Sequence, residues 1–235
     1  MIKTMIWGHR GYPAKFPENS MAGFRYVLDH HIEGIEFDVH LTRDNVPVIM
    51  HDEDIRRTTN GKGYIKRFTL AELRRFKLAN GEPIPTLDEF LTLVENKDVH
   101  LNLEFKTDKF AYPDIEKIVL AKVSQYHLRY PVIYSSFNMQ TLRNCEALAP
   151  DGNYCFLKKT PLLHPLAVVQ REHLSGLHLH FYQDVPGVVE RIWTVDEPHI
   201  AIMLFRKQVD GIFTNNFEAM TILRNKLSQA AQFID

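Results

Sequence analysis

The sequence predicts an α/β fold in which a parallel sheet closes into a barrel. Strand-like and helix-like segments alternate along nearly the whole chain, giving about eight β-then-α units. Strands that alternate with helices favour a parallel sheet, and that number of units in 235 residues suits a closed barrel. A doubly wound open sheet is the competing arrangement, although no Gly-x-Gly-x-x-Gly sequence follows any of the strands.

The first units are marked by clear local patterns. Residues 4–8 form a compact apolar run, and Ser20 is an expected N-cap for a helix over 21–31. Apolar and polar residues alternate over 35–40 with the period of a strand. A further apolar run, 46–50, ends directly at His51.

The later units follow the same rule. Helices are expected over 70–76, from 86 to 94, and over 114–127, 139–148 and 217–230. Strands are expected over 99–105, 132–135, 153–157, 174–180, 191–195 and 211–214. We treat the chain as one barrel domain over 1–235, with further helical segments between the late strands.

Composition excludes several classes of protein. Lys and Arg total 28 against 29 Asp and Glu, so no strong basic field indicates nucleic-acid binding. The two cysteines, Cys145 and Cys155, are expected to be reduced thiols rather than part of a disulfide framework or a zinc site. No segment has the pattern of a signal peptide or a membrane span. We therefore expect a cytoplasmic protein without nucleic-acid partners or stable membrane association.

Polar side chains collect at the predicted carboxyl ends of the strands, where a parallel barrel carries its functional groups. Glu36 and Asp38 are two residues apart, so both leave the same face of their strand, and Glu104 and Lys106 do the same on theirs. The other polar or aromatic residues at strand ends are His9, Arg10, His51, Asp52, Ser135, Ser136, Trp193, Thr194, Asp196, Thr214, Asn215 and Asn216.

These residue types point to phosphoryl chemistry. Three converging carboxylates repel one another unless a cation lies between them, and carboxylate oxygens suit Mg²⁺, Ca²⁺ or Mn²⁺. Histidines titrate near neutral pH and so can transfer protons, which makes His9 and His51 the candidate acid/base pair. Arg10 and Lys106 are suitable partners for a phosphate group. Glu36 and Asp38 could instead form a solvated strand face, and Arg10 could pair with Glu18.

An ordered series of short strings resembles the glycerophosphodiester phosphodiesterase family. They are HRG at 9–11, PENS at 17–20, AGF at 22–24, GIEFDV at 34–39, LTRD at 41–44, VIMHD at 48–52, RTT at 57–59, LEFK at 103–106, WTV at 193–195 and DGIFT at 210–214. The resemblance covers nearly the whole chain.

The resemblance implies a TIM-type (β/α)8 barrel with a small insertion between the second and third βα units, at about 53–85. It implies one divalent cation on Glu36, Asp38 and Glu104, most simply Mg²⁺ or Ca²⁺. It also implies hydrolysis of a small glycerophosphodiester to sn-glycerol 3-phosphate and an alcohol, with His9 and His51 as general acid and base. Arg10 and Lys106 would then surround the phosphate.

Other positions have more than one interpretation. Trp193 is a candidate for substrate contact or for packing, and His180, near the end of the strand over 174–180, is a possible pocket residue. Asp196 stands where Asn is frequent in the family, and Asn215 belongs to a segment that usually contains Asp. These two departures lie at the mouths of late strands, where they are expected to affect headgroup preference.

The glycerophosphodiesterase hypothesis has two alternatives. A related barrel phosphodiesterase could act on phospholipids, like sphingomyelinase D or phosphoinositide phospholipase C, but such enzymes are typically secreted or carry membrane modules. A non-catalytic barrel could retain the site for phosphate binding, but the complete set of histidines and carboxylates argues against this.

Overall fold

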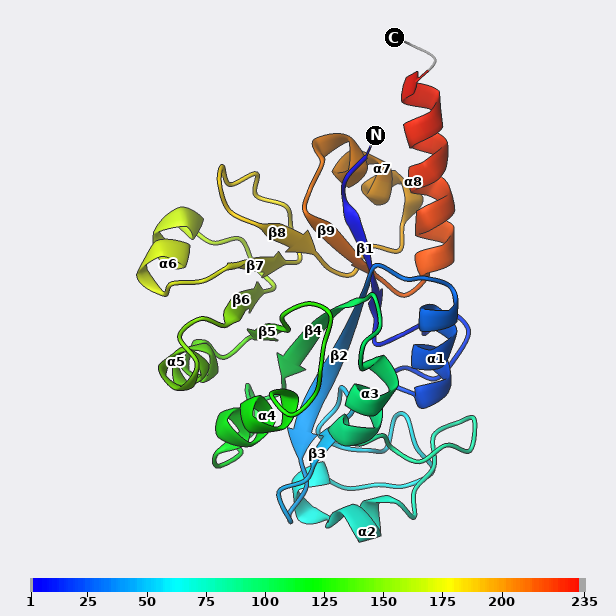
Figure 1. The fold of residues 1–235 in the computed structure, drawn as a ribbon, viewed down its shortest axis with the longest axis vertical. Helices are drawn as coiled ribbons and strands as arrows, with labels where there is room; N and C mark the ends of the chain where they lie inside the picture. The colour runs from blue at the N-terminus through cyan, green and yellow to red at the C-terminus, as the bar shows by residue number, and fades with distance from the viewer. Residues whose placement is uncertain (1, 233–235) are drawn as a thin grey trace.

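Eight parallel strands form a closed barrel in the computed structural model, which describes residues 2–232 (Figure 1). They are β1 (Met5–His9), β2 (Gly34–Leu41), β4 (His100–Phe105), β5 (Ile133–Ser136), β6 (Asn153–Lys158), β7 (Gly176–Leu179), β8 (Glu190–Ile192) and β9 (Gly211–Thr214). Closure occurs at β1, which pairs in parallel with β2 through Trp7 and Gly34 and with β9 through Ile6 and Ile212. The closed ring confirms the predicted TIM-type barrel and excludes the open doubly wound sheet.

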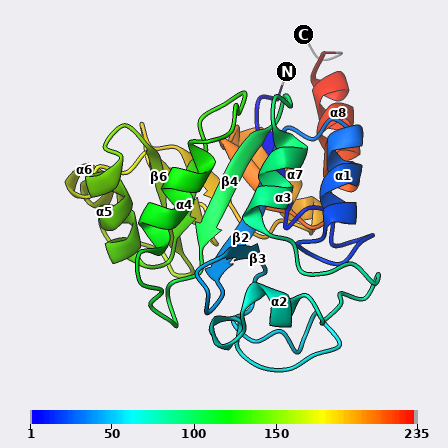
Figure 2. The same ribbon diagram turned by 60° about the horizontal axis from the view of Figure 1, so that its bottom comes forward.

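Helices surround the barrel (Figures 1 and 2). They are α1 (Met21–Asp29), α2 (Leu70–Leu73), α3 (Leu87–Val94), α4 (Ile115–Val123), α5 (Met139–Leu148), α6 (Pro165–Arg171), α7 (Pro198–Lys207) and α8 (Phe217–Gln232), with a 3-10 turn η1 (Ile65–Arg67). Ser20 caps α1 as predicted by accepting a hydrogen bond from the Gly23 amide, and Thr86 with Glu89 forms a capping box on α3. Local cap chemistry therefore determines where these helices begin.

The hydrophobic core has an outer and an inner part. Between helices and strands, the ring of Phe90 packs 4.6 Å from that of Phe24 and 4.3 Å from that of Phe37. Inside the barrel, Trp7 packs 5.7 Å from Phe213. The Trp7 ring lies directly over Gly34, where any side chain would collide with it. A glycine at this position is therefore what allows a tryptophan to fill the barrel.

The segment after the second barrel strand forms a small subsidiary layer beside the barrel (Figure 2). The run predicted over 46–50 becomes β3 (Pro47–Ile49), which pairs antiparallel with the end of β2. The following residues include η1 and α2, and α3 comes after them. Their apolar side chains form a separate cluster of Val48, Met50, Ile55, Ile65, Leu73, Leu78 and Ile84. This cluster fixes the chain that leads away from His51.

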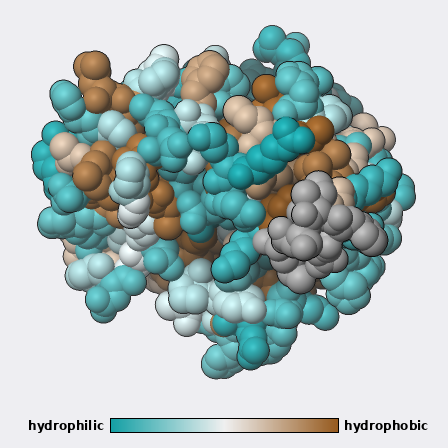
Figure 3. Space-filling view, turned by 90° about the horizontal axis from the view of Figure 1, so that it is seen from above, coloured by the Kyte–Doolittle hydropathy of each residue, from teal (hydrophilic) through white to brown (hydrophobic). Residues whose placement is uncertain are grey.

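The surface is mixed in character. On the face shown in Figure 3, hydrophilic side chains are interspersed with hydrophobic ones. Cys145 and Cys155 are both buried and unpaired. Among residues 2–232, no helix has both the length and the apolar character needed to cross a bilayer.

Candidate active site

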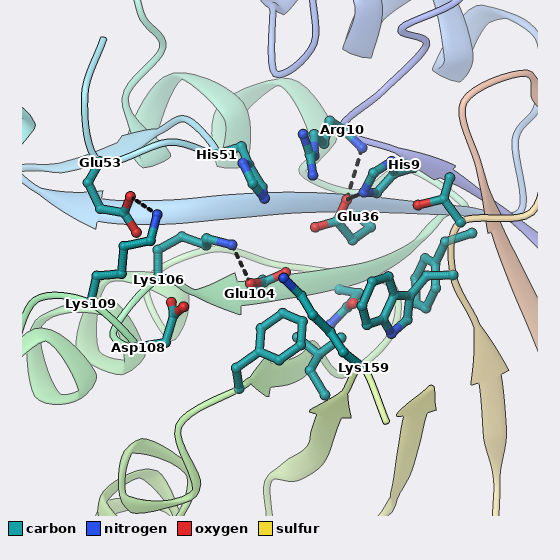
Figure 4. A pocket seen from close by; sticks show the side chains of 16 residues that line it. His9, Arg10, Glu36, His51, Glu53, Glu104, Lys106, Asp108, Lys109 and Lys159 are labelled. Atoms are coloured by element: carbon teal, nitrogen blue, oxygen red, sulfur yellow. Dashed lines mark hydrogen bonds and ion pairs between the residues drawn. The ribbon is translucent and has the colours of Figure 1, made fainter. Parts of the chain in front are cut away.

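A cavity of about 500 Å³ opens at the carboxyl ends of the barrel strands (Figure 4). Seven of the sequence-predicted site residues line it, and one of them is Trp193, after β8; the other six come from β1, β2, β4 and the turns that follow β1, β3 and β4. These six are His9, Arg10, Glu36, His51, Glu104 and Lys106. Asp38 instead lies buried among these groups.

The turn after β1 places His9 and Arg10 at the cavity. Arg10 has a φ of 56°, a left-handed conformation that few residues other than glycine adopt. Its amide donates to the Glu36 carboxylate at 2.9 Å, and its guanidinium donates to Glu18 at 3.0 Å and lies 3.5 Å from Asp38. The alternative pairing of Arg10 with Glu18 therefore occurs, and Arg10 also lines the cavity.

Three carboxylates meet beneath the cavity. The strand period puts Glu36 and Asp38 on the inner face of β2, and the parallel register aligns Asp38 with Glu104 of β4. One oxygen of each carboxylate lies within 4.8 Å of the others, and all three residues are buried. The alternative of a solvated strand face is therefore wrong for Glu36 and Asp38.

Two of the three carboxylates, Glu36 and Glu104, have too little positive charge near them to offset their burial. Burial raises the pKa of Glu36 well above its usual value, and the charges of Asp38 and Glu104 raise it further. Burial also raises the pKa of Glu104, against the opposing effect of Lys106, which donates to it at 2.6 Å. For Asp38, burial is outweighed by Lys106, His51 and Arg10, which hold its pKa below the usual value.

The donor set fits a hard divalent cation. Glu36 Oε1 and Asp38 Oδ1 are buried without any hydrogen-bond partner in the described part of the chain. Buried carboxylate oxygens without a partner are costly, and an oxygen-binding cation would satisfy both at once. Neither cysteine lies at this cluster, so the ligands are all oxygens.

His51 is held by an ion-pair network that includes the subsidiary layer. Its Nδ1 donates to Asp52 at 2.7 Å, and Arg57 binds both Asp52 and Glu18 at 2.6 Å. Burial raises the pKa of Asp52, but its bonds to Arg57 and His51 outweigh this and lower it to about 2. Glu18 in turn accepts from Arg10, so the network links His51 to Arg10.

His9 is held by a second chain of hydrogen bonds. Asn215 donates its amide to Asp196 at 2.6 Å, which turns the amide oxygen toward His9 Nδ1 at 2.8 Å. Because that oxygen can only accept, Nδ1 carries the proton and Nε2 is left 4.0 Å from Glu36. Burial, followed by the charge of Arg10, lowers the pKa of His9 to about 4. Asp196 and Asn215, which were expected to affect headgroup preference, thus act on His9.

The other wall of the cavity is largely apolar. Phe137 and Trp193 pack edge to face at 5.5 Å, and Leu157 and Phe213 lie beside them. His180 is not among the lining residues, which does not support its predicted place in the pocket. β7 ends at Leu179, and the His180 ring lies against Trp193 with Nδ1 3.0 Å from the Trp193 carbonyl oxygen. His180 therefore contacts Trp193 without lining the cavity.

The residues that sequence reasoning missed are mostly partners of those it found. Asn19 has a φ of 54°, and its amide donates to Asp38 at 2.8 Å. Asn is one of the few residues that adopt this conformation readily, and Asn19 stands within one of the strings quoted above. Lys159, which follows β6, reaches into the cavity with its amine (Figure 4). Nothing in its local sequence distinguished Lys159 from a surface lysine.

Comparison with known proteins gives one family over this same region. The model of the glycerophosphoryl diester phosphodiesterase family matches residues 9–219. A glycerophosphodiester phosphodiesterase of Caldanaerobacter subterraneus subsp. tengcongensis is 35% identical over 242 residues, covering 96% of this chain and 99% of the relative.

Two solved structures share the architecture. A glycerophosphodiester phosphodiesterase from Parabacteroides distasonis is 28% identical with a TM-score of 0.84, over 97% of this chain and 99% of that one. An Oleispira antarctica phosphodiesterase in complex with the product sn-glycerol-3-phosphate is 26% identical with a TM-score of 0.85, over 94% and 96% of the two chains. Every predicted site residue lies within the matched region.

Proposed function

Because the chain belongs to the glycerophosphoryl diester phosphodiesterase family, we propose that it hydrolyses glycerophosphodiesters to sn-glycerol 3-phosphate and an alcohol. The main support for the proposal is that two histidines, His9 and His51, lie beside three buried carboxylates at one cavity. The related phosphodiesterase with bound sn-glycerol-3-phosphate supports the product assignment.

Glu36, Asp38 and Glu104 would hold one divalent cation, Mg²⁺ or Ca²⁺, with Mn²⁺ as a third candidate. When bound, such a cation supplies positive charge that stabilises the phosphate oxygens as negative charge develops on them. The feature that supports this role is that one buried oxygen of Glu36 and one of Asp38 accept no hydrogen bond, the latter lying 3.6 Å from Lys106 Nζ.

His9 and His51 would move the protons. Each ring is oriented through its Nδ1, by Asn215 for His9 and by Asp52 for His51, so each leaves Nε2 for the reaction. One histidine removes a proton from the nucleophile, and the other protonates the departing alkoxide. The two orienting groups differ in charge, since Asp52 is a carboxylate and Asn215 a neutral amide.

Arg10 and Lys106 would bind the phosphate. Both line the cavity, and both are anchored by carboxylates, Arg10 by Glu18 and Lys106 by Glu104. Anchored cations do not have to be ordered when the substrate binds, which reduces the entropic cost of binding. The apolar wall formed by Phe137 and Trp193 excludes water from one side of the same cavity.

The nucleophile has two chemical candidates, the glycerol 2-hydroxyl and a water molecule. Attack by the hydroxyl gives a cyclic phosphate that is then hydrolysed, and attack by water gives the product directly. A phosphorus NMR time course separates them, because only the first route forms a cyclic species.

The test of the function is a coupled assay for glycerol 3-phosphate with glycerophosphocholine, glycerophosphoethanolamine and glycerophosphoglycerol as substrates. We expect release from at least one of them, and a loss of roughly 10²–10⁴-fold in His9→Ala and in His51→Ala. Near-wild-type turnover in either variant would contradict its assignment. Release of headgroup from diacyl phospholipid vesicles, with none from the water-soluble diesters, would overturn the proposed substrate class.

A further inference from the structure

The opposite end of the barrel contains a second cavity that the proposed reaction does not use. It has a volume of about 280 Å³ and lies where the barrel strands begin, at the first residues of β4, β5 and β6. Polar lining residues include His100, Tyr130, Asn153, Ser175 and Arg191. All described lining residues are neutral or basic, and none is an aspartate or a glutamate. We call this the basal cavity.

Arg191 is the charged group of the basal cavity, and its surroundings are neutral. It is the second residue of β8, and its Nη1 lies 3.4 Å from His178 Nε2 and 3.9 Å from the Cys155 sulfur. Its guanidinium carbon lies 5.3 Å from the centre of the Trp7 ring. Within residues 2–232, no carboxylate lies within ion-pair distance of Arg191. Arg191 therefore has no ion-pair partner within the described residues.

The groups around Arg191 offer more donors than acceptors. Arg191 Nε, His178 Nδ1 and Trp7 Nε1 are all buried, and none has a partner in the described chain. His178 is fully buried, and burial with the charge of Arg191 keeps its pKa well below the usual value, so it is a neutral ring that accepts from Arg191. Arg191 is only partly buried and lines the cavity, so a ligand there can reach its guanidinium, and a cation without a carboxylate partner favours a ligand that carries negative charge.

The remaining polar groups have the capacity to contact such a ligand. Ser175 Oγ accepts a hydrogen bond from the Tyr154 amide, so its hydroxyl proton remains available, and Asn153 contributes a side-chain amide to the lining. Tyr130 is already engaged by Asp98 at 2.7 Å. Arginine presents a planar set of N–H groups that matches the oxygen atoms of oxyanions.

We propose that the basal cavity binds a small tetrahedral oxyanion, of the inorganic phosphate or sulfate class, through the guanidinium of Arg191. Ser175 and Asn153 supply further donors. This site lies at the end of the barrel remote from His9 and His51, so it is separate from the phosphate contacts of the proposed reaction. The inference stands whether or not the chain hydrolyses glycerophosphodiesters.

The two tryptophans of the chain provide independent reporters for the two ends of the barrel. Trp7 contacts Arg191, and Trp193 lines the candidate active site. In protein with ¹⁵N-labelled tryptophan, the indole N–H groups give two signals, which Trp193→Phe assigns. Inorganic phosphate is titrated into the full chain at constant ionic strength, with sodium chloride as the balancing salt.

We expect the Trp7 signal to shift saturably with phosphate, with an affinity of its own that differs from that of the Trp193 response. Arg191→Met should weaken the Trp7 response by at least about tenfold, because a charged hydrogen bond is lost, and should leave the Trp193 response and turnover unchanged. The matched control is Arg10→Met, which should weaken the Trp193 response and spare that of Trp7. A Trp7 signal that ignores phosphate, or that shifts equally in Arg191→Met, would overturn the proposal.

Folding of the variants is checked by the dispersion of the same spectra. If Arg191→Met does not fold, Arg191→Lys and Ser175→Ala replace it, and each is expected to retain the fold and weaken the Trp7 response. Unaltered affinity in both of these variants counts against the site. Sulfate in place of phosphate should give the same Trp7 shift, whereas a shift produced equally by chloride would show a non-selective cationic pocket and reject an oxyanion site.

Discussion

Exchanging the residues at positions 196 and 215 tests how His9 is held. Asn215 lies between His9 and Asp196, 2.8 Å from His9 Nδ1 and 2.6 Å from the Asp196 carboxylate. The negative charge of Asp196 therefore does not contact His9 directly. Asn215→Asp alone would bring two carboxylates to about 3 Å, where they repel by about 1.4 kcal/mol in water and about 5.5 kcal/mol at an effective dielectric of 20. Because Asp196 is exposed, the lower value applies, and it corresponds to a loss of about tenfold in kcat/KM.

Asp196→Asn alone replaces a charged acceptor with a neutral one and should cost about 0.5–1.5 kcal/mol, or roughly two- to tenfold. The double exchange again gives one carboxylate and one amide in contact, so it removes the repulsion and its kcat/KM should exceed that of Asn215→Asp, although the carboxylate now contacts His9 Nδ1 directly. The assay is glycerol 3-phosphate release at saturating metal, with thermal melting as a check on folding. A double variant as poor as the product of the two single losses would refute the coupling of these residues through His9.

Further predictions concern the second histidine and the stability of the fold. Asp52→Asn should lower kcat by roughly 10–100-fold, since the charge that orients His51 is lost, and Arg57→Met should lower it less; steady-state kinetics measures both. An equal or larger loss in Arg57→Met would contradict this order. Gly34→Ala forces a methyl group against Trp7 and should destabilise the fold by about 1–3 kcal/mol, seen as a Tm lower by roughly 2–4 °C per kcal/mol. An unchanged Tm would show that the barrel interior accommodates the added methyl group without loss of stability. The pKa of His178 lies well below its usual value, so below about pH 6.5 the unfolded chain binds a proton that the folded chain does not. Stability should therefore fall as pH falls, by up to about 1.4 kcal/mol per pH unit for this one group, and His178→Asn should remove that part of the slope in urea denaturation between about pH 7 and pH 5.5. The same slope in both proteins would contradict a neutral buried His178.

Local sequence patterns predicted the positions of side chains that depend on a single strand or a single turn. The alternation put Glu36 with Asp38 on one face of β2 and Glu104 with Lys106 on one face of β4, because a strand has a period of two, and the family resemblance indicated that both faces point inward. The position of His9 followed from the rule that polar side chains collect at the carboxyl ends of barrel strands. For these residues the barrel topology adds only the closure that brings them together.

The partners of the two histidines depend on contacts that no local pattern encodes. His9 and Asn215 are 206 residues apart and meet only because β9 closes the barrel against β1. Arg57 reaches Glu18, 39 residues away, from the subsidiary layer, whose path depends on its own apolar cluster. His180 was predicted near the pocket from its place at a strand end, but β7 ends one residue earlier than expected and the His180 ring contacts Trp193 without lining the cavity.

The most direct test of the account is the release of glycerol 3-phosphate from a glycerophosphodiester before and after removal of divalent cations. The buried carboxylates of Glu36, Asp38 and Glu104 predict that a chelator abolishes activity and that Mg²⁺ or Ca²⁺ restores it. They also predict that Asp38→Asn, with the fold intact by thermal melting, is not rescued by the same cation concentration. Full activity in excess chelator, or wild-type activity in Asp38→Asn, would contradict the account.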